Sequence, residues 1–226
     1  DWGYYTTPQE NANNRKIPHT RGKVLGGSSS VNGMLWVRGN RANYDAWAAE
    51  GNVGWDADTV NDVYKRVEDF EDGANDYRGS GGPIKVQRHT QPTEAAQLFE
   101  QACADTLGVK VLEDYNAAEQ EGVSAFQQSI HDGLRYSSSR GYVHDLSPQL
   151  LDVRTSIHVN KIIINNGRAT GVEVIDKSGA TQTITADKEV ILSAGVFGSP
   201  QILQLSGVGP ADHLKQFGIN VVADLP

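Results

Sequence analysis

The segment between Arg21 and Met34 combines residue types that could bind a cofactor. It reads Arg-Gly-Lys-Val-Leu-Gly-Gly-Ser-Ser-Ser-Val-Asn-Gly-Met. Its glycines would let backbone N–H groups come close to a ligand, because no Cβ stands in the way, and its consecutive serines add hydroxyl groups. This pattern suits a phosphate or a flat ring, although a surface loop rich in glycine and serine would have the same composition. A P-loop is excluded, because that motif places its lysine after the last glycine and Lys23 precedes the glycine pair here.

Histidines and paired carboxylates are the other residues that could carry out chemistry. Histidine is the usual general base near neutral pH, but none of the six histidines has a carboxylate or serine partner at the spacing of a known motif. We therefore expect the following to be structural or exposed: His19, His89, His131, His144, His158 and His213. The pairs Glu68-Asp69 and Glu71-Asp72 fall on the polar face of a predicted helix, so we expect solvated carboxylates there. We also expect no metal site.

The composition narrows the class of protein. The 226 residues suffice for one large domain or two small ones, and 38% hydrophobic with 21% charged residues indicates a folded chain. The net charge of -8, without a basic cluster, argues against nucleic acid as a partner. No apolar run approaches the roughly 18 residues of a membrane span. We expect a soluble protein, with the cytoplasm slightly favoured among compartments that the sequence leaves open.

The single cysteine and the single methionine narrow the class of protein further. The single cysteine, Cys103, excludes an internal disulfide and a cysteine-based zinc site, and we expect it to be buried on the apolar face of a helix. The chain starts at Asp1 and its only methionine is Met34. We therefore expect a piece of a longer protein.

Helical spacing and capping residues predict where the helices lie. We expect four helices, over 44–50, from 56 to near 73, from 92 to 108, and over 138–146. Asn43 should cap the first of them, and the last should be capped by its own serine. The glycine-rich stretch 73–82 is the best candidate for a boundary between subregions.

Strands are predicted mainly in the last third of the chain. Single strands are expected at 84–87 and 123–131, and a meander of four short runs at 156–159, 161–165, 171–176 and 182–186. The apolar run 189–193 predicts a buried strand of a parallel sheet. It leads through Ala194-Gly195 to a helix expected to start at Ser199-Pro200, as in nucleotide-binding α/β folds.

Two long motifs now carry a resemblance to a known family. Arg21 to Gly33, followed by Trp36–Asn40 and Tyr44–Trp47, resembles the first signature of the glucose-methanol-choline (GMC) oxidoreductases, flavoenzymes that oxidise alcohols. Gly198 to Pro210 resembles their second signature. Shorter matches point to the choline-dehydrogenase-like branch: Asp1–Tyr4, Asp114–Asn116, Arg135–Ser137 and Gly218–Pro226.

The resemblance implies an α/β fold in three stretches. We expect residues 1–78 and 135–226 to form a partial, Rossmann-like FAD-binding domain, and the β-meander belongs to the second of these stretches. Residues 79–134 should form part of an α+β substrate-binding domain. FAD is the implied cofactor. It should be non-covalent, because Val31 stands where some family members attach FAD to a histidine.

The resemblance also implies site residues. Those expected at the pyrophosphate and the isoalloxazine ring are Arg21, Gly22, Val24, Gly26, Gly27 and Ser28. Those expected beside the reactive face of the ring are Asn32, Gly33 and Met34. Those expected at the adenine and at the strand-end turn are Val159, Ala194 and Gly195. The family's dinucleotide fingerprint would lie before Asp1, and its catalytic histidine beyond Pro226, so we expect no catalytic residue within this chain.

The function that the resemblance implies is transfer of a hydride from a primary or similar small alcohol to FAD, with oxygen or a quinone-like compound as the electron acceptor. Two alternatives stay open at this point. A few relatives use the same fold for lyase chemistry on cyanohydrins, and the chain could also be a non-enzymatic module that no longer holds FAD.

Overall fold

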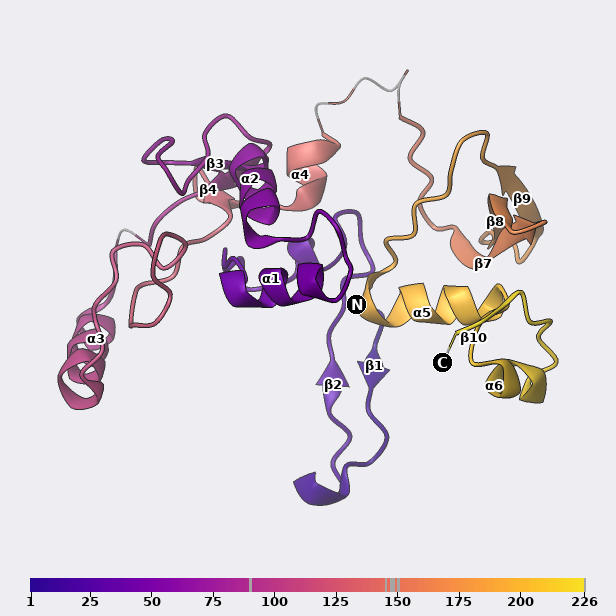
Figure 1. Cartoon of the computed structure of the whole chain (residues 1–226), viewed down its shortest axis with the longest axis horizontal. Helices are drawn as coiled ribbons and strands as arrows, with labels where there is room; N and C mark the ends of the chain where they lie inside the picture. Colours follow the sequence, from indigo (N-terminus) through magenta and orange to yellow (C-terminus); the bar gives the residue numbers. More distant parts are fainter. Residues whose placement is uncertain (90, 145, 147–148, 150, 226) are drawn as a thin grey trace. The chain divides into compact units, whose positions relative to one another are not determined.

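The computed structural model describes residues 1–89, 91–144, 146, 149 and 151–225 (Figure 1). Helices and strands are mixed along the chain, which confirms the α/β class. The chain forms two compact units, residues 1–151 and 152–226, and we describe each by itself. The predicted division at 78/79 and 134/135 stays a prediction. Within the described residues, no helix is long and apolar enough to cross a membrane.

The first unit begins with a hairpin that leads into the glycine-rich loop. Strands β1 (Tyr4–Tyr5) and β2 (Pro18–His19) pair antiparallel, and the 3-10 helix η1 (Glu10–Ala12) lies between them. A second 3-10 helix, η2 (Gly27–Ser30), follows within the loop. The hairpin therefore delivers the chain to the segment that the sequence singled out.

Helix α1 (Arg41–Ala49) begins earlier than predicted. The side chain of Asn40, three positions before the predicted cap Asn43, accepts a hydrogen bond from Ala42 N at 2.9 Å. Asn40 is therefore the N-cap, since its extended backbone and side-chain oxygen satisfy a free N–H group at the helix start. Gly51, with φ +98°, follows the helix end as predicted.

Helix α2 (Ala57–Val67) starts at the predicted cap, where Asp56 accepts from Thr59 N at 3.0 Å, but it ends six residues before Gly73. Residues Glu68–Phe70 form strand β3, which pairs in parallel with β4 (Ile84–Val86). The prediction that the helix continues through Phe70 was wrong. Phe70 is instead buried in a small core with Ile84 and Val86, against Trp36 and Val67. This pairing turns the chain out of the helix.

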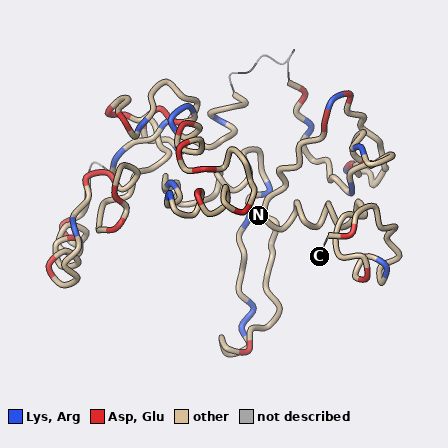
Figure 2. The backbone as a smooth tube through the Cα atoms, viewed as in Figure 1, with Lys and Arg blue, Asp and Glu red and all other residues tan. Residues whose placement is uncertain are grey.

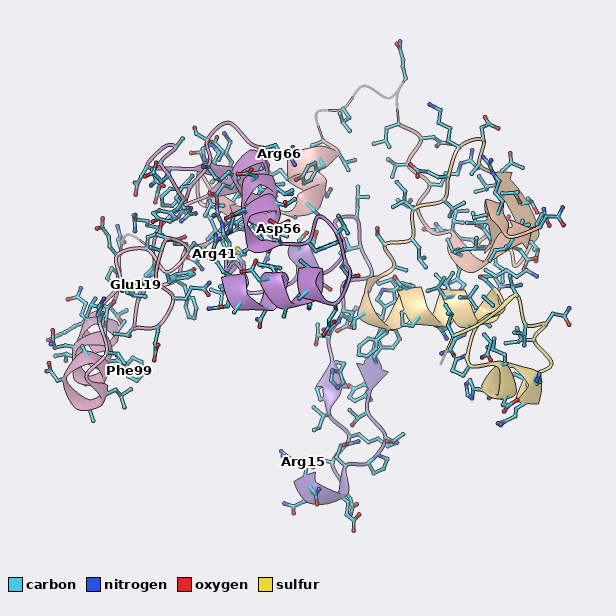
Figure 3. The ribbon with its side chains drawn as sticks, viewed as in Figure 1. Arg15, Arg41, Asp56, Arg66, Phe99 and Glu119 are labelled. Atoms are coloured by element: carbon cyan, nitrogen blue, oxygen red, sulfur yellow. The ribbon has the colours of Figure 1, made fainter. Side chains whose placement is uncertain are left out.

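Helix α3 (Glu94–Leu107) has its predicted end at Gly108, and Thr93 caps its start. Its apolar side chains are not buried: Leu98, Phe99 and Leu107 are 64%, 68% and 68% exposed, and Cys103 is only half-buried. Figure 3 labels Phe99 on this helix. The expectation of a buried Cys103 was wrong, because none of the described residues of α3 is buried by a neighbouring element.

The remaining elements of the first unit are short. The strand predicted at 123–131 is reduced to β5 (Ile130–His131), which pairs with β6 (Leu134–Arg135). Isolated bridges replace the rest, for example Val111 with Val123. Helix α4 (Ser138–Tyr142) is capped by Ser137 rather than by its own serine. Of the predicted span to 146, residue 145 lies outside the described residues.

The second unit contains the predicted meander. Strands β7 (His158–Asn165), β8 (Arg168–Ile175) and β9 (Thr181–Thr185) form one antiparallel sheet in that order. The first two predicted runs are a single strand with a register shift between Val159 and Lys161. Asn166 and Gly167, with φ +50° and +78°, form the predicted β7–β8 turn, where positive φ suits a tight hairpin.

The chain then reaches helix α5 (Gly195–Leu205), with Pro200 inside it rather than at its start. Strand β10 (Val208–Gly209), helix α6 (Ala211–Gln216) and strand β11 (Ala223–Asp224) follow, and β10 pairs in parallel with β11. The strand predicted at 189–193 is not formed, and Ile191 is 79% exposed. Among the described residues no strand pairs with this run, so its apolar side chains have no sheet in which to be buried.

Candidate functional site

The loop from Arg21 to Met34 folds back on itself around η2. Gly27 N donates to Val24 O at 2.8 Å, and Gly22 N donates to Ser28 Oγ at 3.2 Å. Gly26 and Gly27 both have positive φ, +88° and +55°, a conformation that favours glycine. The glycine pair is therefore required by the backbone of the loop itself.

The glycines of the loop face different surroundings. A Cβ on Gly22 would lie 2.2 Å from Gly27 O, and one on Gly26 would lie 2.5 Å from Ser30 Oγ. A Cβ on Gly27 would meet no heavy atom of the chain within 4 Å. Gly22 and Gly26 are thus closed inside the loop, whereas Gly27 presents bare backbone to open space, where a flat ring or a phosphate can approach.

Two serines that are not among the predicted site residues, Ser29 and Ser30, also hold the loop together. Ser29 Oγ donates to Gly26 O at 2.6 Å, and Ser30 Oγ donates to Leu25 O at 2.8 Å. Ser138 N, at the start of α4, donates to Ser29 Oγ at 3.0 Å. Their hydroxyl groups are used inside the protein. The run of three serines was the available signal, but the partner of Ser29 lies 109 residues away in the sequence.

The end of the loop is fixed by a second long-range contact. Asn32 Oδ1 accepts from Arg135 Nη1 at 2.8 Å and from Met34 N at 3.0 Å. The same Arg135 nitrogen donates to Ser29 O at 3.2 Å. Met34 itself has φ +64°, which is uncommon for a residue with a side chain. Arg135, which the sequence analysis named only within a matching motif, is therefore a central partner of the loop.

The predicted site residues fall into two groups. Nine lie together in the loop of the first unit: Arg21, Gly22, Val24, Gly26, Gly27, Ser28, Asn32, Gly33 and Met34. The other three lie in the second unit. Val159 of β7 pairs with Val174 of β8, and Ala194 and Gly195 stand at the start of α5. Val31, the position that has no nucleophilic atom, is 45% exposed.

A buried charged cluster follows the loop along the chain. Glu68 and Arg78 are fully buried, and Glu68 Oε1 accepts from Arg38 Nη2 at 2.5 Å and from Arg78 Nε at 2.9 Å. Arg78 also pairs with Asp114 at 3.0 Å. The expectation that Glu68 is solvated was wrong, because β3 turns this carboxylate between two arginines that the sequence places far from it.

The cluster changes the acidity of its members. Burial lowers the pKa of Arg38 despite the attraction of Glu68. At Asp114 burial raises the pKa, but hydrogen bonds from Gln127 and the charge of Arg78 outweigh it and bring the pKa below its ordinary value. Asp69 and Lys85 also form an ion pair across β3 and β4. The carboxylates predicted as solvated are thus largely engaged in structural ion pairs.

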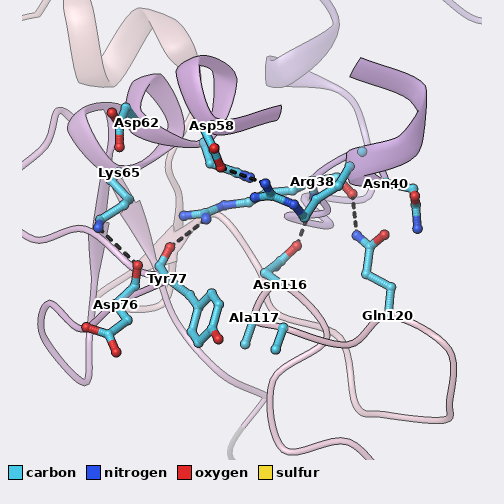
Figure 4. A pocket seen from close by; sticks show the side chains of 14 residues that line it. Arg38, Asn40, Asp58, Asp62, Lys65, Asp76, Tyr77, Asn116, Ala117 and Gln120 are labelled. Carbon is cyan, nitrogen blue, oxygen red and sulfur yellow. Dashed lines mark hydrogen bonds and ion pairs between the residues drawn. The ribbon is translucent and has the colours of Figure 1, made fainter. Parts of the chain in front are cut away.

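A polar cavity of about 340 Å³ lies beside this cluster (Figure 4). Arg38 Nη1 donates to Tyr77 O at 2.6 Å, Lys65 Nζ to Asp76 O at 3.0 Å, and Gln120 Nε2 to Arg38 O at 3.0 Å. None of the predicted site residues lines it. Within the part of the chain that the structure describes, no group of three or more His, Cys, Asp and Glu side chains could hold a metal ion. The glycine loop therefore stays the candidate site.

Comparison with known proteins defines the class to which this loop belongs. Residues 6–225 match the family model of the GMC oxidoreductases, so the chain belongs to this family. This confirms the resemblance, and with it FAD as the family's cofactor. The open space beside the Gly27 backbone fits such a group, because it leaves room for a flat ring.

Individual relatives make the class more specific. The chain is 42% identical over 226 residues to an "Oxygen-dependent choline dehydrogenase" of Sinorhizobium medicae (strain WSM419), covering all of this chain and 41% of the relative. Among solved structures, it is similar to pyridoxine 4-oxidase from Mesorbium loti (TM-score 0.92, 29% identity, 100% of this chain and 45% of the other). It is also similar to an FAD-dependent oxidoreductase from Chaetomium thermophilum (TM-score 0.91, 30% identity, 100% and 41%). The chain thus spans about 41% of the length of the curated relatives that it matches.

Proposed function

We propose that this chain supplies the loop that holds the flavin ring in an FAD-dependent alcohol dehydrogenase or oxidase. The observation that carries the proposal is the open space beside the Gly27 backbone, in a loop where Gly22, Gly26 and the hydroxyls of Ser29 and Ser30 are closed by internal contacts. When bound, FAD accepts the hydride that leaves the carbinol carbon of the alcohol. The chain's own task is to hold that ring still and to aim hydrogen-bond donors at it.

The substrate we propose is a small primary or similar alcohol such as choline, and the acceptor is oxygen or a quinone-like compound. The name of relatives at 40 to 43% identity, oxygen-dependent choline dehydrogenase, supports a small alcohol such as choline as the substrate and oxygen as the acceptor. We place the base that takes the hydroxyl proton outside this chain, because none of the six histidines belongs to the loop. His131, for example, lies 3.5 Å from Asp132 with both side chains exposed.

Anaerobic reduction tests this function in the full-length protein that contains the chain. We expect the purified protein to be yellow, with absorbance near about 450 nm as flavins generally show, and choline or another small alcohol to bleach it without oxygen. A yellow protein that no alcohol bleaches, but that cleaves a cyanohydrin, would favour the lyase alternative. A colourless folded protein that FAD does not reconstitute would favour a non-enzymatic module.

The attachment of FAD is tested in the same preparation. Acid precipitation should release all of the flavin into the supernatant, since the Val31 side chain has no atom that could form a covalent bond to it. Flavin is measured by absorbance in the supernatant and the pellet. Yellow colour that stays in a washed pellet would contradict non-covalent binding.

A further inference from the structure

The side-chain amide of Asn32 is fixed in one orientation by its partners. Its Oδ1 atom receives hydrogen bonds from Arg135 Nη1 and Met34 N, at 2.8 and 3.0 Å. Both partners are donors only, and an amide oxygen accepts two hydrogen bonds through its two lone pairs. The reversed amide would set its NH2 group against a guanidinium and a backbone N–H. Chemistry therefore excludes the flipped orientation.

The fixed orientation leaves a donor group free. The Asn32 residue is exposed, and among the described residues no acceptor bonds its NH2 group. Gly27, in the same loop, presents bare backbone to open space. The loop therefore offers an oriented pair of N–H donors as well as room for a ligand.

We propose that Arg135 is a positioning residue for the flavin, which fixes Asn32 so that its NH2 group is a hydrogen-bond donor to the bound ring. This rests on the proposed function. The ring gains negative charge when a hydride arrives, and a donor held in place stabilises that charge without first having to reorient. Arg135 remains bonded to Ser29 O and Asn32 Oδ1, so it acts through the amide.

Two substitutions separate the donor from its anchor. Asn32→Asp keeps an oxygen that can accept from Arg135 and Met34 N, but it removes the NH2 donor and adds a negative charge. Arg135→Met removes the anchor and frees the amide to rotate. In the flavin-loaded full-length protein, we expect each variant to make reduction of the bound flavin less favourable by tenfold or more in its equilibrium constant. This corresponds to about 30 mV for a two-electron couple.

The measurement is an anaerobic reductive titration of bound FAD against a reference dye, which needs no turnover. Arg140→Met is the matched control. It also removes a positive charge close by in the chain, but the Arg140 guanidinium lies over the Tyr136 ring at 5.5 Å rather than on the loop. We expect its flavin potential to match the wild type. Arg135→Lys, which can still donate to Asn32, should recover part of the loss.

A double substitution tests whether the two residues act along one path. If Arg135 works through Asn32, then Arg135→Met should add less than twofold to the effect of Asn32→Ala on the equilibrium constant. Potentials within twofold of wild type in both Asn32→Asp and Arg135→Met, in proteins that hold FAD and are bleached by alcohol, would overturn this inference alone. If Arg135→Met loses FAD, Asn32→Asp and Asn32→Ala decide in the same way, and potentials within twofold of wild type in both would overturn the inference. A wild-type protein without flavin would overturn the proposed function too.

Discussion

Gly22 and Gly27 lie in the same loop, yet a larger side chain would have opposite consequences at the two positions. A Cβ on Gly22 would lie 2.2 Å from Gly27 O, so the loop itself would have to open. At Gly27 the space is open, and only the positive φ of +55° opposes a side chain, at a cost of roughly 1 to 2 kcal/mol. The first glycine is required by the packing of the loop, whereas at the second the open space is what we propose the ligand needs.

Gly27→Val in the full-length protein should therefore lose FAD while the protein stays folded. The branched side chain would occupy the space where the cofactor meets the backbone. The flavin-to-protein ratio and a thermal unfolding curve measure the two effects separately. Gly179→Val is the control, because Gly179 also has positive φ, +83°, and open space around it, but lies in the β8–β9 turn. Normal flavin content in a folded Gly27→Val variant would refute the assignment of this loop.

Glu68 is the residue on which the buried charges depend. Glu68→Gln should lower the free energy of unfolding by about 3 to 5 kcal/mol, because Arg38 and Arg78 would be left without their shared counter-charge. Urea unfolding measures the loss. Glu119→Gln removes a partner of Lys110 on the surface, where both side chains are more than half exposed, and should cost at most about 1 kcal/mol. Equal effects of the two substitutions would contradict the role of Glu68.

The sequence could predict the role of a residue where that role depends on its neighbours in the chain, but not where it depends on residues far away in the sequence. Gly26 and Gly27 were found because a tight turn leaves a direct mark in residue type. Glu68 was misassigned because helical spacing continues through it, and only Arg38 and Arg78, 30 and 10 positions away, show that it is buried. Arg135 was missed as a site residue because its acceptor Asn32 lies 103 positions earlier.

At the scale of elements, the sequence predicted helix ends that a local cap marks and strands that a hairpin turn joins. Asp56 caps the start of α2 and Gly108 caps the end of α3, and each cap acts within a few residues. The run 189–193 has the composition of a buried strand, but a strand needs a partner for its backbone, and none of the described residues provides one. Apolar composition alone therefore overpredicted this element.

In the second unit one hydroxyl links the sheet to the end of the long helix. Ser206 Oγ, just after α5, accepts from Ile162 N of β7 at 2.8 Å and donates to Ile202 O at 2.5 Å. Ser206→Ala should cost about 1 to 3 kcal/mol in unfolding free energy, because the buried Ile162 N–H would lose its partner.

Thermal or urea unfolding checks this loss. Ser178→Ala, in the exposed turn where Ser178 Oγ bonds Asp176 Oδ1, is the matched control and should change stability by less than about 0.5 kcal/mol. If Ser206→Ala is as mild as this control, β7 and α5 are not held together by the hydroxyl.

At the scale of the whole molecule, acidic and basic residues are interspersed along the chain of both units rather than gathered by sign (Figure 2). The apolar side chains are distributed differently. Large hydrophobic residues of α3 and of the 189–193 run are exposed, among them Phe99 and Ile191. The chain of 226 residues thus leaves uncovered much of the apolar surface that a compact enzyme would bury.

This uncovered surface leads to a prediction for the chain expressed by itself. The loop proposed to accept the flavin is formed, but among the described residues no sheet fixes the 189–193 run before Ala194 and Gly195. A cofactor that needs both segments would have to order the second one on binding, and that ordering reduces affinity. We expect the isolated chain to bind FAD more weakly than micromolar, which corresponds to less than about 8 kcal/mol of binding free energy. Quenching of FAD fluorescence in a titration measures this, with the full-length protein as the reference, and a micromolar or tighter dissociation constant for the isolated chain would show that the loop suffices.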